Sequence, residues 1–63
     1  MSDCLDKCSR ELNDALDIET NRHKAKLLAC GSDPACIDAE YQNHINIVFA
    51  LHEKYKACRA ACG

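Results

Sequence analysis

The six cysteines of the chain fall into three pairs whose residue numbers have the same sum. Cys4 with Cys62, Cys8 with Cys58, and Cys30 with Cys36 each total 66. A constant sum is the pattern of an antiparallel hairpin, because residues i and 66−i then lie at the same height on opposite arms. The pattern therefore predicts that the chain folds back near Asp33 and that a disulfide joins each of the three pairs.

The distribution of Gly and Pro predicts that both arms are helices. Neither residue occurs between Cys4 and Cys30 or between Ala35 and Cys62, whereas Gly31-Ser32-Asp33-Pro34 stand together. Gly31 suits the left-handed position that ends a helix, Ser32 or Asp33 can cap the next helix, and Pro34 fits its first turn. We expect an all-α fold, an antiparallel two-helix hairpin that forms a single domain over residues 1–63. Its helices are expected at about 3–30 and 35–62, with the turn at 31–34, as a rod roughly 40 Å long.

Each expected helix carries a stripe of side chains that would face the other. In the second helix the stripe alternates spacings of four and three, as in a coiled coil. It consists of Ile37, Tyr41, His44, Val48, Leu51, Tyr55, Cys58 and Cys62. The first helix offers Leu5, Cys8, Leu12, Leu16, Glu19 or Thr20, His23, Leu27 and Cys30, so its stripe is polar in the middle.

The charges agree with this register. Acidic residues stand early and basic residues late in each helix, which complements the helix dipoles. Lys26 and Glu40 also sum to 66, which places them at the same height and supports the register, while a solvated face is the favoured interpretation for any single charge. The net charge of −2 lacks the basic footprint of a nucleic-acid-binding protein, and nucleic acid is not an expected partner.

Composition places the chain among small disulfide-rich proteins. Cysteine makes up about one residue in ten of a 63-residue chain that can build only a small core. We expect an oxidising compartment, periplasmic or secreted, with the mitochondrial intermembrane space as the alternative. No apolar run approaches the length of a membrane span, since the longest, Ile47 to Leu51, is flanked by polar residues.

Two C-x3-C elements, Cys4/Cys8 and Cys58/Cys62, place two cysteines one helical turn apart on each arm. We favour two parallel rungs between these turns, because the swapped pairs, Cys4 with Cys58 and Cys8 with Cys62, need a skewed approach of the helices. Four thiolates from two turns could instead bind zinc or copper, and this alternative stays open.

The twin C-x3-C pattern resembles that of disulfide-linked helical hairpins. These include plant α-hairpinins and the small translocase chaperones and related twin-cysteine proteins of the mitochondrial intermembrane space. In those families the inner cysteines of the two motifs join each other and the outer cysteines join each other. The resemblance therefore implies the bonds Cys8–Cys58 and Cys4–Cys62. It also implies protease inhibition, antimicrobial action or chaperoning as candidate activities.

Glu19-x3-His23 in the first helix is repeated as Glu40-x3-His44 in the second, and the fold-back brings both histidines to nearly equal height. Imidazole and carboxylate groups suit zinc, copper or nickel, so these four residues are a candidate metal site. A glutamate four residues before a histidine is also a common stabilising surface pair, and a histidine on a helix seam usually belongs to a hydrogen-bonded layer. We favour a structural polar layer, with plain exposure of these side chains as a further alternative.

The middle of the second helix has more apolar side chains than a lone hairpin can cover. Ile45, Ile47 and Phe49 lie around Val48 and Leu51, and we assign the first three to an interface. We expect the hairpin to dimerise into a four-helix bundle, with an unknown protein partner as the alternative.

The sequence shows none of the usual catalytic motifs, such as a nucleophile elbow, a C-x-x-C redox motif or a glycine-rich loop. We expect no catalytic residues and no cofactor. The first hypothesis is a non-enzymatic hairpin that acts through protein contacts, above all self-association. The second is a metal-binding or metal-trafficking protein that uses either the four terminal cysteines or the Glu/His layer.

Overall fold

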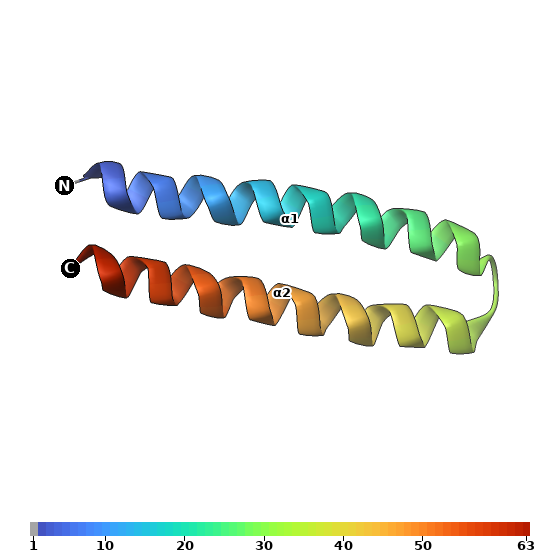
Figure 1. Cartoon of the computed structure of the whole chain (residues 1–63). Coiled ribbons are helices and arrows are strands. Elements are labelled where there is room, and N and C mark those ends of the chain that lie inside the picture. The colour runs from blue at the N-terminus through green and yellow to red at the C-terminus, as the bar shows by residue number, and fades with distance from the viewer. Residues whose placement is uncertain (1) are drawn as a thin grey trace.

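A computed structural model describes residues 2–63, which form two long helices joined by a tight turn. Helix α1 spans Ser2–Cys30 and helix α2 spans Pro34–Cys62. Figure 1 shows the two helices side by side and antiparallel, with both chain ends at one end of the hairpin and the turn at the other. The molecule measures 48 × 15 × 7 Å, so the predicted all-α hairpin is confirmed as a thin rod.

The turn follows from the residues that interrupt the helical pattern. Gly31 has φ +62°, a left-handed conformation that glycine adopts without a steric penalty. Asp33 is the N-cap of α2, and its carboxylate accepts hydrogen bonds from the backbone N–H groups of Ala35 (3.1 Å) and Cys36 (3.5 Å). Pro34 follows in the first turn, where its missing N–H has no helical partner.

Three disulfides join the helices in the predicted pairs, Cys4–Cys62, Cys8–Cys58 and Cys30–Cys36. The paired Cα atoms are 5.8, 5.9 and 5.4 Å apart, within the usual range for a disulfide. The first two bonds close the open end of the hairpin and the third closes the turn. All six cysteines are therefore used in crosslinks between the arms.

The interface between the helices contains little fully buried apolar surface. Among the described residues, Cys8 is the one buried apolar side chain, with 2% of its surface exposed. Leu12, Leu16, Val48 and Leu51 are half-buried along the seam. Crosslinks therefore carry much of the stability, and closing the 59-residue loop from Cys4 to Cys62 contributes about 4 kcal/mol in the chain-entropy model.

The seam of α2 differs from the expected stripe at one position. Tyr41 is exposed, and Glu40 is buried in its place. The hydrophobic pattern favoured Tyr41 as the residue that faces α1. A glutamate can take that place where a partner neutralises its charge, and Glu40 has such partners, as described below. In α1 the stripe was expected to include either Glu19 or Thr20, and the structure buries Glu19. Leu5, also expected in the stripe, is exposed.

Candidate functional site

The four residues of the predicted polar layer meet near the middle of the rod. Glu19 of α1 and Glu40 of α2 have only 4% and 5% of their surface exposed. His23 Nδ1 lies 2.7 Å from Glu40 Oε2, and His44 Nδ1 lies 2.8 Å from Glu19 Oε2. The structure thus brings together all four residues, but each histidine binds the glutamate of the opposite helix. The common i,i+4 surface pair of a glutamate with the histidine of its own helix is not what links these four residues.

A fifth residue, Arg22, completes the layer and was not predicted. Its guanidinium donates to both carboxylate oxygens of Glu19, from Nε and Nη2 at 2.7 Å each. The same group donates to Glu40, from Nη1 at 3.2 Å and from Nη2 at 2.7 Å. One guanidinium therefore joins two buried carboxylates on different helices, as its planar fork of donors allows. The sequence signal was the three-residue spacing from Glu19 to Arg22, whereas the sum of 66 placed Lys26 opposite Glu40.

The ion pairs control the ionisation of the layer. Hydrogen bonds from Arg22 lower the pKa of Glu19 from its usual 4.5 to about 2, with help from His44 and against the opposing effect of burial. Arg22 and His23 likewise lower the pKa of Glu40. In return, the two carboxylates raise the pKa of Arg22. Both glutamates are therefore ionised at neutral pH, although they are buried.

The two histidine rings stack on each other within the layer. Their centroids are 3.9 Å apart with an angle of 17° between the ring planes, and the edge of Tyr41 meets His23 at 5.2 Å. An ionised carboxylate can only accept a hydrogen bond, so each Nδ1 carries the hydrogen that it donates. The contacts to Glu40 and Glu19 thus fix the tautomer and the orientation of both rings.

This arrangement favours a structural layer over a metal centre at these residues. The carboxylate oxygens of Glu19 and Glu40 already accept hydrogen bonds from Arg22, His23 and His44. Because the stacked rings lie in nearly parallel planes, the remaining Nε2 lone pairs do not converge on one point. A metal ion would have to displace the guanidinium and turn the rings before it could use these ligands.

A second cluster lies at the open end, where the Sγ atoms of Cys4, Cys8 and Cys62 are all within 4.8 Å of one another. In the oxidised protein these sulfurs belong to disulfides and offer no thiolate to a metal. The two C-x3-C turns therefore hold these three sulfur atoms in one cluster. Only the reduced protein could use them as ligands.

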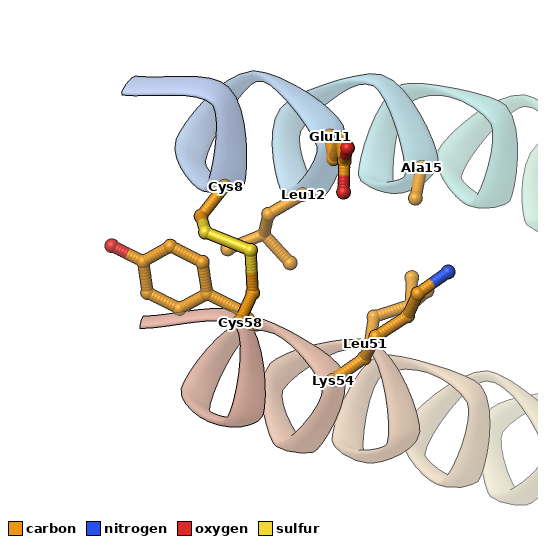
Figure 2. Close-up of a pocket in the computed structure, with 8 residues that line it drawn as sticks. Cys8, Glu11, Leu12, Ala15, Leu51, Lys54 and Cys58 are labelled. Carbon is orange, nitrogen blue, oxygen red and sulfur yellow. A yellow bond between two sulfur atoms is a disulfide. The ribbon is translucent and has the colours of Figure 1, made fainter. Parts of the chain in front are cut away.

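A shallow groove between the helices begins at the inner disulfide of this end. Figure 2 shows the Cys8–Cys58 bond crossing from one helix to the other, with Leu12 beside it and Ala15 and Leu51 further along the groove. Glu11 and Lys54 also line the groove, which has a volume of about 60 Å³. Sites for drug-sized ligands occupy roughly 300–1,000 Å³, so this groove is too small to enclose such a molecule.

The exposed face of α2 carries a row of large apolar side chains. Tyr41, Ile45 and Phe49 have 47%, 57% and 66% of their surface exposed, and their four-residue spacing places them on one stripe of the helix. Ile47, the third predicted interface residue, is half-buried. It stands two residues from Ile45, about 200° around the helix, and cannot join the stripe. Ile18 and Leu28 of α1 are also exposed.

Within the described residues 2–63, neither helix has the combination of length and apolar character needed to cross a bilayer. The chain matches no protein-family model, and no curated protein or solved structure matches it significantly. The twin C-x3-C resemblance therefore remains a prediction.

Proposed function

We propose that the protein is a non-enzymatic helical rod that acts through protein contacts, and that its first partner is a second copy of itself. The observation that carries this proposal is the exposed apolar stripe of Tyr41, Ile45 and Phe49 on α2. Contiguous apolar surface of this kind marks interaction sites on proteins that otherwise expose polar side chains. Burying the stripes of two hairpins against each other gives the expected four-helix bundle.

The stripe continues at both ends with charged or polar residues. Asp38, Tyr41, Ile45, Phe49, His52 and Lys56 follow one another at spacings of three or four residues, and all six are exposed. This is the spacing of a coiled-coil seam. The stripe is therefore apolar at its centre, acidic at its N-terminal end and basic at its C-terminal end.

This charge order selects an antiparallel pairing of the two α2 helices. A two-fold axis at Ile45 would place Tyr41 against Phe49 of the partner subunit. The same axis would bring Asp38 beside the partner subunit's His52, with the partner's Lys56 one turn further along. A parallel pairing would instead set Asp38 against its own copy, and like charges in contact oppose association.

The polar layer supports this role by fixing the surface that the partner meets. The edge of Tyr41 contacts His23, whose Nδ1 is held by Glu40. The disulfides prevent the helices from sliding or separating. Because little conformational freedom remains to be lost, a small apolar stripe can support binding.

The stripe is small, and this limits the affinity. Three large side chains that are about half exposed offer roughly 300 Å² of surface, whereas a standard interface buries about 800 Å² per partner. We expect a reversible dimer with a Kd in the micromolar range, assembled at high local concentration.

Sedimentation over a range of protein concentrations tests the proposal. The unmodified protein is expected to pass from monomer to dimer, and Phe49→Asp is expected to remain a folded monomer because the side chain is exposed. Leu28→Asp is the matched control, since Leu28 is exposed on α1 and should leave dimerisation unchanged. A monomer at every concentration up to about 1 mM would refute self-association.

Charge reversal tests the antiparallel register separately. Lys56→Glu alone would set acid against acid at both ends of the stripe and should weaken the dimer about three- to tenfold, since each exposed pair is worth ~0.2–1 kcal/mol. The double variant Asp38→Lys with Lys56→Glu should restore the affinity. A double variant as weak as the single one would exclude this register.

Metal binding is the second candidate, and the closeness of the Cys4, Cys8 and Cys62 sulfurs is the observation that favours it. It requires the reduced protein, in which Cys58 would be the fourth ligand of a tetrahedral site. Titration of reduced protein with zinc under anaerobic conditions tests it. Binding of one zinc that Cys58→Ser abolishes would support a thiolate site, and no heat or spectral change would exclude it.

The three disulfides fit an oxidising compartment. We place the protein in the periplasm or outside the cell, with the mitochondrial intermembrane space as the alternative. An intact mass measured on protein from its native cells tests this placement. A deficit of six hydrogens is expected, and a fully reduced chain would contradict it.

A further inference from the structure

The two disulfides at the open end of the hairpin touch each other. Cys8 Sγ lies 3.7 Å from Cys62 Sγ, although Cys8 is bonded to Cys58 and Cys62 is bonded to Cys4. Neither sulfur carries a hydrogen, so this is a van der Waals contact between sulfurs. Reacting atoms in near-attack geometry are about 3–3.5 Å apart, so a small side-chain movement separates this contact from a reactive one.

The four sulfur-bearing side chains differ in their exposure to solvent. Cys4 is exposed, Cys58 and Cys62 are half-buried, and Cys8 is almost completely buried. A thiol from solution therefore reaches the outer disulfide first, and it reaches it at Cys4. The inner disulfide is protected from direct attack at Cys8, but that sulfur is in contact with Cys62.

We propose that this end is a thiol–disulfide exchange site for small thiols, in which a reduction that enters at Cys4 is relayed through Cys62 and Cys8 to Cys58. Two observations support the proposal: the contact between Cys8 Sγ and Cys62 Sγ, and the exposure of Cys4 to solvent. The relay requires no side chain outside the C-x3-C turns.

The reaction proceeds by successive thiolate attacks. The thiolate of the small molecule attacks Cys4 Sγ, forms a mixed disulfide with it and releases Cys62 as a thiolate. The Cys62 thiolate then attacks Cys8 Sγ, so that the Cys8–Cys62 bond forms and the Cys8–Cys58 bond breaks. Cys58 leaves with the electron pair and takes up a proton from water.

A second small thiol completes the exchange. It attacks the small-molecule sulfur of the mixed disulfide, which releases Cys4 as a thiol and produces the symmetric disulfide of the small molecule. In total, two thiols are oxidised to one disulfide, and the protein gains two hydrogens, one on Cys4 and one on Cys58. The protein keeps one crosslink at this end throughout, so the hairpin stays closed while thiol groups become available.

Trypsin gives a direct readout, because it cleaves after Lys and Arg and thereby separates all four cysteines. The relevant peptides are 1–7 with Cys4, 8–10 with Cys8, 57–59 with Cys58 and 60–63 with Cys62. Oxidised protein is incubated with glutathione, its free thiols are blocked with iodoacetamide, and the unreduced digest is analysed by mass spectrometry. The relay predicts peptide 8–10 joined to 60–63, together with alkylated 57–59, in a yield independent of protein concentration. If every partly reduced molecule keeps 8–10 joined to 57–59, the proposal is wrong.

Two single variants test the relay without added thiol. Cys4→Ser leaves Cys62 unbonded beside Cys8, and the bonds Cys8–Cys58 and Cys8–Cys62 are expected to coexist within about tenfold of each other. Cys36→Ser also leaves one unbonded cysteine, Cys30, but at the turn end of the rod, and it should keep Cys8–Cys58 alone. The proposal would be overturned if Cys8 in the Cys4→Ser protein were bonded to Cys58 alone. It would also be overturned if the Cys36→Ser protein contained as much Cys8–Cys62 bond as the Cys4→Ser protein.

Discussion

At the scale of single residues, Arg22 determines whether two carboxylates can remain buried between the helices. It donates hydrogen bonds to both Glu19 and Glu40, while about a third of its own side chain is exposed. Removing one partner of a buried charged group costs more than the interaction itself contributes, because the remaining charge loses both water and its partner.

Replacement of Arg22 by Met should therefore lower the melting temperature by roughly 5–15 °C. Arg10→Met is the matched control, because Arg10 is an exposed arginine of the same helix and its loss should shift the melting temperature by no more than a degree or two. Thermal unfolding followed by far-UV circular dichroism gives both values. Equal shifts for the two variants would mean that the layer contributes nothing to stability.

The same layer makes stability depend on pH. Hydrogen bonds from Arg22 lower the pKa of Glu19 to about 2 in the folded protein, from its usual 4.5. The ionised carboxylate thus favours the folded state above pH 4.5, and this contribution disappears as the pH falls toward 2. The lowered pKa of Glu40 acts in the same direction.

The melting temperature of the unmodified protein should accordingly fall between pH 5 and pH 2. Glu19→Gln should be less stable at pH 6 and should lose less stability over this range, since it lacks one of the groups that titrate. Glu53→Gln, at an exposed position of α2, should keep the full pH dependence. Parallel curves for all three proteins would contradict the account of Glu19.

The sequence predicted the cysteine pairs at this scale and only part of the polar layer. Cysteine side chains are short, so bonded pairs stay at equal height and their numbers sum to 66. Longer side chains reach along the rod, and His23 with Glu40 sums to 63 while Arg22 with Glu40 sums to 62. The equal-height rule therefore placed Lys26 opposite Glu40, and it missed the guanidinium of Arg22 one turn away.

At the scale of elements, the turn is specified by a few local interactions. Gly31 supplies the left-handed conformation, and Asp33 caps α2 through its side chain. These choices could be predicted because each depends on nearest neighbours and not on packing. The burial of Glu40 in place of Tyr41 could not be predicted in this way, because it depends on charged partners from α1.

Asp33→Ala should lower the free energy of unfolding by about 1 kcal/mol, because two N–H groups of the first turn of α2 lose their acceptor. Asp38→Ala is the control, since Asp38 is exposed inside the helix and caps nothing. Guanidinium unfolding of the two variants measures the difference. A loss for Asp33→Ala no larger than that for Asp38→Ala would show that the cap is unimportant.

At the scale of the whole molecule, the hairpin is a thin rod whose helices share one fully buried apolar side chain among the described residues. Crosslinks at both ends and an ion-paired layer near the middle take the place of a large core. This construction leaves the outer face of α2 available for the self-association proposed above. The register in which the arms meet determines which side chains lie on that face.

The most direct test of this register is a tryptic map of the unreduced protein with its free thiols blocked. The antiparallel register predicts peptide 1–7 joined to 60–63, peptide 8–10 joined to 57–59, and peptide 27–54 closed on itself by Cys30–Cys36. Peptide 1–7 or 60–63 joined to 27–54 would place a terminal cysteine at the bend, and the antiparallel rod would be wrong.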